Sequence, residues 1–298
     1  MKATKAFSTT YTYTLGKSLY VPLTSRCNSL TLPQTRGPNF LLPTDVVNSL
    51  LNVRSVEENN SPLDNLEGLS EQAIDGPFDN FGLTRRILPA PIFVKEFSQD
   101  SISSDGCYPS EESLLQEMIQ FMTQSLKTKI GELDHISNKK LDAIVIAGEG
   151  EPTLRLGTIL NIARRLRAES TVSTEETLIE KEDDIIPMRL VTNGLPLAEM
   201  KAPFRKSILS QLKDEGITEM SVALMTSCPR QYANLMQPLV RADCIHDELC
   251  ETIRDAIEVG MDVELTGVEH DFVDKNLASE LAIELGVKKI FRWRPFFP

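Results

Sequence analysis

The sequence predicts an α/β fold built on a parallel sheet. From Pro109 to the end of the 298-residue chain, short apolar runs alternate with longer stretches whose apolar residues recur at helical spacing. The run at 143–147 (AIVIA) is apolar at every position, as expected for a strand buried on both faces. Strands that alternate with helices pair in parallel through right-handed crossovers, so the sheet is either open and doubly wound or a partial or full barrel.

Each expected strand is a short apolar run bounded by turn residues, and each helix has an apolar stripe. Ser110 can cap the first of these helices, while Gly260 and Gly286 can end two others. Both architectures place ligand chemistry beyond the carboxyl ends of the strands. The strands are expected at 19–23, 143–147, 188–192, 220–225, 263–267 and 288–293, and the helices at 110–126, 153–166, 197–212, 230–235, 247–259 and 275–285.

Residues 1–298 are treated as a single barrel-like domain with two acidic interruptions. The 37–109 insertion is expected to be largely loop or disordered, because its 55–80 stretch has seven acids and no base. The 169–186 segment, with seven acids and one lysine, is expected to be an acidic loop. Residues 86–94 can dock on the body, although their prolines disfavour a central strand.

The net charge of −12 argues against partners that are nucleic acids or anionic membranes. This exclusion is weakened because the two acidic stretches carry −13, which leaves about +1 for the rest. No apolar run approaches the ~18 residues of a membrane span. The basic start at 1–44 resembles an organellar transit peptide but lacks the apolar core of a secretory signal. We expect a cytoplasmic protein that binds a small molecule, and no protein partner is indicated.

Five scattered cysteines without a C-x2-C pair favour neither a disulfide framework nor a zinc ribbon. More informative are the residues that follow the strands. The Gly-Glu turn at 148–153 before a helix is a generic nest for a carboxylate or phosphate, but such a turn can also serve backbone geometry only. Thr192 and Asn193 offer a hydroxyl and an amide beside it.

Five motifs occur in order over residues 15–38 and 111–297. They are Thr-x-Arg-Cys at 24–27, Gly-x-Gly-Glu-Pro-Thr-Leu-Arg-Leu at 148–156, Thr-Asn-Gly-Leu at 192–195, Ser-Val-x-Leu at 221–224 followed by Tyr232 and Pro238, and Phe-Arg-x-Arg-Pro-Phe at 291–296. Together they resemble the radical S-adenosylmethionine (SAM) superfamily, and within it the TatD-associated type.

The resemblance implies a partial (βα)6 TIM-type barrel in which SAM lies across the strand ends and ligates the open iron of a 4Fe–4S cluster. The family's Gly-Gly-Glu-Pro motif, which contacts the methionine amino group, matches 149–152, so Glu151 would accept the ammonium. Arg292 would belong to the rim, or would instead seal the barrel edge through salt bridges. No catalytic residue is assigned. The implied SAM-binding residues are Gly148, Glu149, Gly150, Glu151, Pro152, Thr192, Asn193, Ser221, Gly267 and Arg292.

The chain departs from the family at the cluster ligands. Where the family has three cysteines, this sequence has Cys27, Thr31 and Gln34. Clusters are held by soft thiolates, which a threonine hydroxyl and a glutamine carbonyl do not replace. We therefore expect a degenerate enzyme or scaffold that has lost its cluster and retains a SAM pocket. The alternatives are an active radical SAM enzyme whose cluster uses Cys27 and unrecognised ligands, such as Cys107 or Cys228, and a cluster-free enzyme using Glu151 in acid–base work.

Overall fold

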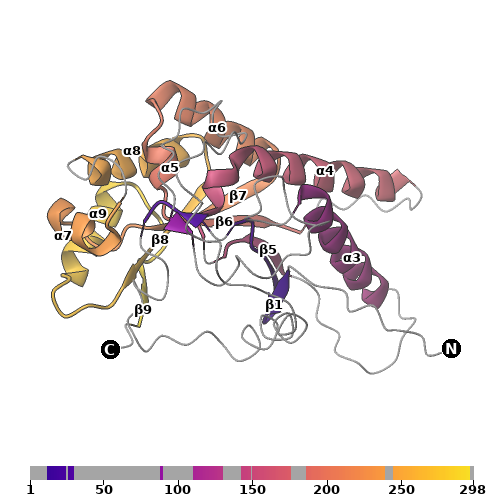
Figure 1. Ribbon diagram of the computed structural model, residues 1–298, viewed down its shortest axis with the longest axis horizontal. Helices are drawn as coiled ribbons and strands as arrows, with labels where there is room; N and C mark the ends of the chain where they lie inside the picture. Colours follow the sequence, from indigo (N-terminus) through magenta and orange to yellow (C-terminus); the bar gives the residue numbers. More distant parts are fainter. Residues whose placement is uncertain are drawn as a thin grey trace, which may run out of the picture.

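The computed structural model describes residues 12–24, 26–29, 88–89, 110–129, 142–148, 150–175, 186–238 and 244–295. Within these ranges a seven-stranded sheet, ordered β1-β2-β5-β6-β7-β8-β9, curls into a half barrel with helices along one side (Figure 1). β1 pairs antiparallel with β2, and all other neighbours in this sheet are parallel. The predicted partial TIM-type barrel is confirmed.

All six predicted strands are present in this sheet. Their bounds are Ser18–Val21 (β2), Ala143–Ile146 (β5), Met188–Thr192 (β6), Ile217–Ala223 (β7), Asp262–Val268 (β8) and Arg292–Arg294 (β9). The first strand, β1 (Tyr13–Leu15), was not predicted. It forms a hairpin with β2 through Gly16, whose φ of 61° lies in the region that glycine adopts without strain.

The helices follow the predicted order, with one correction. The single helix expected at 197–212 is two helices, α5 (Leu195–Ala198) and α6 (Ala202–Asp214), separated at Lys201. Pro203 explains the break, because it has no N–H to donate to the carbonyl four residues earlier, as a continuous helix would require, whereas the first turn of a new helix tolerates it. The others are α3 (Glu111–Lys129), the 3₁₀ helix η5 (Pro152–Arg155), α4 (Leu156–Glu175), α7 (Pro229–Met236), α8 (Ile245–Glu258) and α9 (Lys275–Glu284).

The structure describes a part of each acidic interruption, and only the 169–186 segment differs from expectation. Helix α4 continues to Glu175, so the start of the 169–186 segment is helical and the prediction of a loop there was wrong. Extending an existing helix adds one hydrogen bond for each residue fixed, which is far easier than nucleating a new helix. In the 37–109 insertion, Leu88–Pro89 (β4) pairs with Arg26–Cys27 (β3) outside the main sheet. The remainder of that insertion lies outside the described residues.

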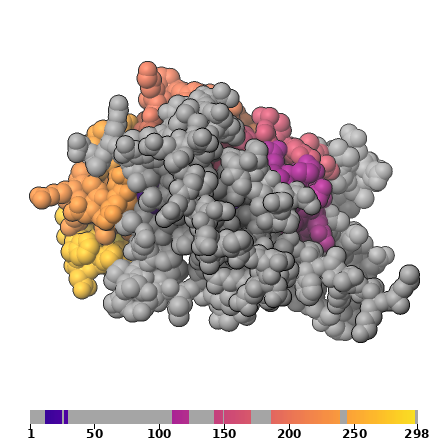
Figure 2. Space-filling view, viewed as in Figure 1, coloured from indigo at the N-terminus to yellow at the C-terminus, as the bar shows by residue number. Residues whose placement is uncertain are grey.

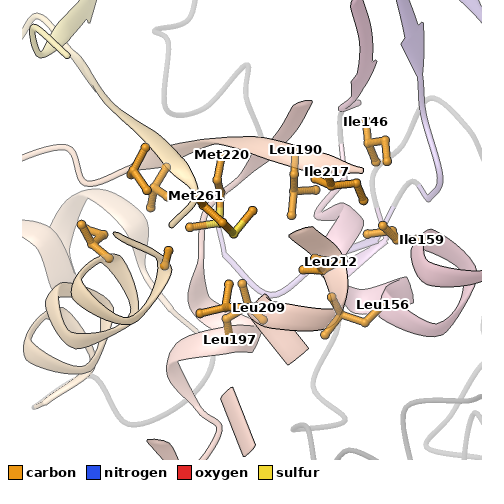
Figure 3. Packing of buried hydrophobic residues seen from close by; sticks show 14 of the residues in the cluster. Ile146, Leu156, Ile159, Leu190, Leu197, Leu209, Leu212, Ile217, Met220 and Met261 are labelled. Carbon is orange, nitrogen blue, oxygen red and sulfur yellow. The ribbon is translucent and has the colours of Figure 1, made fainter. Parts of the chain in front are cut away.

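The hydrophobic core lies between the helices and one face of the sheet. Register places Ile146, Leu190 and Met220 on this face, and all three are at most 1% exposed. In Figure 3 these residues converge with the labelled leucines of α6 and with Leu156 and Ile159 of α4. Successive strand residues point to opposite faces, so the intervening positions line the other face.

That second face, which we call the inner face, carries polar and charged residues. Ser221 lies in register with Glu264, and Arg189 with Glu219. At the strand starts, Lys289 Nζ bridges Asp262 Oδ2 at 2.7 Å and Glu219 Oε2 at 3.3 Å. The charged side chains of these strands are therefore kept on the inner face, while the helix-covered face is apolar up to Thr192 at the end of β6.

The space-filling view places α3 and the C-terminal helices at opposite sides of the face shown (Figure 2). Within the described ranges, no helix has the length and apolar character needed to span a membrane.

Candidate functional site

The turn after β5 brings Glu151 into the interior. A Cβ on Gly148 would lie 3.0 Å from Pro22 Cβ, so a side chain at this position would crowd the residue that follows β2. Glu151 is the N-cap of η5, and its side chain accepts a hydrogen bond from the Thr153 N–H at 2.9 Å. Pro152 occupies the first turn, where its missing N–H costs nothing. The sequence thus turns sharply and buries an acid at the strand end.

The Glu151 carboxylate is 3% exposed and joins the ends of β5 and β6. Besides the Thr153 N–H, Oε1 accepts from the Thr153 hydroxyl at 2.5 Å and the Thr192 hydroxyl at 2.6 Å. Oε2 accepts from the Asn193 N–H at 2.6 Å. In the described ranges no lysine, arginine or histidine forms an ion pair with this carboxylate. Burial raises the pKa of Glu151 above its usual range, and the donors from Thr153, Thr192 and Asn193 offset part of that shift.

The turn after β6 is fixed by its own side chains. Thr192 Oγ1 accepts from the Gly194 N–H at 2.8 Å, and Asn193 Oδ1 accepts from the Leu195 N–H at 2.9 Å. Gly194 has a φ of 74°, and an added Cβ would lie 2.4 Å from Leu249. With these turns fixed, the Thr192 hydroxyl donates to Glu151, and the Asn193 amide donates to the segment that contains Asn28.

Asn193 links this turn to Cys27. Its Nδ2 donates to Asn28 Oδ1 at 3.0 Å and lies 3.7 Å from Cys27 Sγ. The thiol is 5% exposed, and burial, followed by the charge of Glu151, raises the pKa of Cys27 to about 12. Cys27, Glu151 and Asn193 therefore meet at one edge of the sheet, as the order of the parallel strands predicted.

The other implied binding residues are divided between places. Gly150 lies in the same turn as Glu151, but Ser221 and Arg292 lie on the inner face. Thr192 is next to Val191, which is in register with Ser221, so the Thr192 and Ser221 side chains point to opposite faces of the sheet.

Arg292 is paired on the inner face rather than open at the rim. Its Nη2 donates to Glu264 Oε2 at 2.7 Å and to Ser221 Oγ at 3.3 Å. This matches the edge-sealing salt bridge that the sequence left open as an alternative. A Cβ on Gly267 would lie 2.8 Å from Trp293, whose ring stacks on Phe291 at 4.5 Å, so Gly267 serves a close packing contact.

The described residues around Cys27 offer one thiol and the side-chain amide of Asn193. In the ranges that the structure describes, no three Cys, His, Asp or Glu side chains are placed to hold one metal ion. The Cys27 sulfur is contacted by an amide nitrogen, whereas a cluster needs thiolates. Thr31, Gln34, Cys107 and Glu149 lie outside the described residues.

Sequence reasoning missed two residues of this hydrogen-bond network and assigned no role to a third, buried residue nearby. Thr153, within the quoted 148–156 motif, supplies two of the four hydrogen bonds to Glu151. Asn28 follows Cys27 directly and accepts from Asn193. Tyr232 was quoted as part of a motif without a role, and it is fully buried on α7. Thr153 and Asn28 could have been proposed from the sequence, because each lies within two residues of a residue already assigned to the site.

No family model matches this sequence, and neither does any curated protein. Among solved structures, the chain is similar to methylornithine synthase (PylB), with a TM-score of 0.34 and 13% identity over 60% of this chain and 44% of that chain. For HydG, a maturase of the FeFe-hydrogenase, the TM-score is 0.39 and the identity 13%, over 61% of this chain and 36% of that one. For Streptococcus suis SuiB bound to precursor peptide SuiA, the TM-score is 0.40 and the identity 14%, over 91% of this chain and 63% of that chain. This chain thus spans less than two thirds of each, and likenesses this weak leave the function to be argued from the site's own residues.

Proposed function

We propose that this protein is a radical-SAM-like barrel that binds SAM, or a related ligand with an ammonium group, at the β5–β6 edge and has lost the 4Fe–4S cluster. One observation carries the proposal: Glu151 is a buried carboxylate held by four neutral donors and paired with no cation in the described ranges. A buried carboxylate without a counter-ion is costly, so the site favours a ligand that brings positive charge.

The carboxylate has unused acceptor capacity at Oε2 among the hydrogen bonds of the described residues. Oε1 already accepts three hydrogen bonds, whereas Oε2 accepts one, from the Asn193 N–H. Each carboxylate oxygen can accept two or more. A ligand ammonium at Oε2 would favour the ionised form and lower the raised pKa of Glu151.

The loss of the cluster is argued from the donor chemistry. Thiolates are the cluster ligands, and Cys27 supplies one thiol at the family's first ligand position. The two family positions after it are Thr31 and Gln34. Without a cluster, the site binds its ligand but has no reductant with which to cleave the sulfonium. The protein would then act as a scaffold or as a degenerate enzyme.

Anaerobic reconstitution with iron and sulfide tests the loss of the cluster. We expect no stable four-iron loading, the same iron content in the wild type and in Cys27→Ala, and no 5′-deoxyadenosine from SAM and dithionite. Four irons per chain that depend on Cys27, together with 5′-deoxyadenosine formation, would instead establish an active radical SAM enzyme.

Calorimetric titration tests the pocket. SAM should bind the wild type, and 5′-methylthioadenosine, which lacks the amino-acid group, should bind at least about tenfold more weakly, a difference of about 1.4 kcal/mol. Glu151→Gln removes the charge with little change in shape and should remove this preference. The matched control Glu264→Gln alters an acid on the inner face and should retain it. A wild type that does not bind SAM, or that binds the two ligands equally, would contradict the proposal.

A further inference from the structure

Tyr232 carries a buried hydroxyl without a hydrogen-bond partner in the described part of the chain. The residue is 0% exposed, and its Oη is among the few buried side-chain atoms there that lack a partner. A buried hydroxyl normally finds a partner, because leaving it unpaired destabilises the folded state. Such an atom near a proposed binding site indicates a group that is completed by a ligand.

The packing of α7 places Tyr232 beside the site. One helical turn further on, the Met236 carbonyl accepts a hydrogen bond from Ser29 Oγ at 2.7 Å, so α7 lies against the segment that begins with Cys27. Residues four apart share one face of a helix, and Tyr232 and Met236 are the buried pair of α7. Tyr232 thus lies on the buried face of α7, one helical turn before the residue whose carbonyl contacts this segment.

The Tyr232 ring also packs against α8. The His246 ring packs edge-on at 5.4 Å between centroids, and its Nε2 is bonded to the Thr226 carbonyl at 3.0 Å. The other nitrogen, Nδ1, lies 3.9 Å from Cys250 Sγ and 3.7 Å from Asp247 Oδ1. The histidine is thus engaged elsewhere and does not satisfy the hydroxyl.

The electrostatic surroundings agree with this placement. Burial, followed by the charges of Glu151, Cys250 and Cys27, raises the pKa of Tyr232 above its usual range. The hydroxyl therefore stays protonated near neutrality and is able to donate. A donor in the same buried region as the Glu151 carboxylate complements a ligand that has an ammonium and an oxygen acceptor close together.

We infer that the Tyr232 hydroxyl is a ligand-binding group that donates a hydrogen bond to the carboxylate of an α-amino-acid moiety whose ammonium is bound by Glu151. This inference rests on the proposed SAM site and extends it, because it assigns the recognition of both charged groups of the ligand. A ligand that lacks the amino-acid moiety does not engage Tyr232.

Tyr232→Phe removes the hydroxyl and retains the ring that packs against His246. Without ligand, the urea midpoint of this variant should equal or exceed that of the wild type, because no internal hydrogen bond is lost. With SAM, the dissociation constant should rise about tenfold. For 5′-methylthioadenosine it should not change. Tyr20→Phe, at a half-buried tyrosine of β2 whose ring stacks on Tyr13, is the matched control and should leave both affinities unchanged.

The outcomes separate this inference from the proposed function. If the wild type binds SAM and Tyr232→Phe binds it equally well, the inference is wrong and the SAM site stands. A clear loss of stability in the unliganded variant shows that the hydroxyl is bonded inside the protein, which also overturns the inference. An equal loss for both ligands refutes the assignment to the carboxylate. If the wild type does not bind SAM, both proposals fail together.

Discussion

Two acids are buried in the described part of this protein, and their surroundings differ in kind. Asp255 on α8 is 5% exposed and lies 2.6 Å from Nε of Arg205 on α6, which is itself 2% exposed. Lys206 Nζ adds a second cation at 3.5 Å. Glu151 is equally buried, yet its four bonds come from two hydroxyls and two backbone N–H groups.

The difference separates a structural charge from one that is available to a ligand. Asp255 is neutralised within the scaffold, where the pair fixes α6 against α8. Acids on the inner face are likewise paired, Glu264 with Arg292 and Glu219 with Lys289. Glu151 is solvated by neutral groups, and burial raises its pKa. A charge compensated only by dipoles is the one that an incoming cation can bind.

The largest effect is expected when the structural pair is broken. Arg205→Met leaves Asp255 buried with only the more distant Lys206, and should lower the free energy of unfolding by about 3–5 kcal/mol. Urea denaturation measures this loss. Arg164→Met, which breaks the exposed pair with Glu215, is the matched control and should have little effect.

If Arg205→Met is folded under the assay conditions, its SAM affinity should equal that of the wild type. A stability loss no greater than that of Arg164→Met would show that the buried pair is not the structural element proposed here. The double variant Arg205→Met/Asp255→Leu should recover stability, because it leaves no uncompensated charge.

A smaller effect is expected at the Glu151 network. Thr192→Val removes the donor to Glu151 Oε1 and the acceptor of the Gly194 N–H, while it conserves side-chain volume. Unpaired buried groups predict a loss of about 1–3 kcal/mol in the free energy of unfolding. Thr192→Ser retains the hydroxyl and should lose less. Equal urea midpoints for Thr192→Val and the wild type would indicate that these bonds contribute nothing to the fold.

The pH dependence of stability tests the Glu151 surroundings and is the smallest effect, about 1.4 kcal/mol for each unit of pKa shift. The pKa of Glu151 is raised in the folded state, so the folded protein holds this proton more tightly than the unfolded chain does. The resulting stabilisation is complete below the ordinary carboxyl pKa of ~4 and is lost as the pH rises through the folded-state pKa. Over that interval, unfolding free energies should fall for the wild type relative to Glu151→Gln. A flat or rising difference would contradict a raised pKa.

The sequence predicted the scaffold because its signals are local. Alternating apolar runs located the six parallel strands, and parallel strands bring their carboxyl ends to one edge. That was enough to predict that Cys27, Glu151 and Asn193 converge. The local patterns gave wrong helix bounds at two places. The apolar spacing predicted one helix where Pro203 separates α5 from α6, and the polar composition predicted a loop where α4 continues to Glu175.

The sequence by itself determined the positions of six strands along the chain, the expectation that Cys27, Glu151 and Asn193 meet at the strand ends, and the absence of cysteine at positions 31 and 34. Only the tertiary structure decided that Ser221 and Arg292 lie on the inner face, that Glu151 is held by neutral donors and that the Tyr232 hydroxyl lacks a partner in the described ranges. The physical reason is that burial and hydrogen bonding depend on residues far apart in the chain. Glu151 meets Asn193 across 42 residues, and Ser29 meets Met236 across 207. Such contacts leave no periodic trace in the sequence and form when the sheet closes around them.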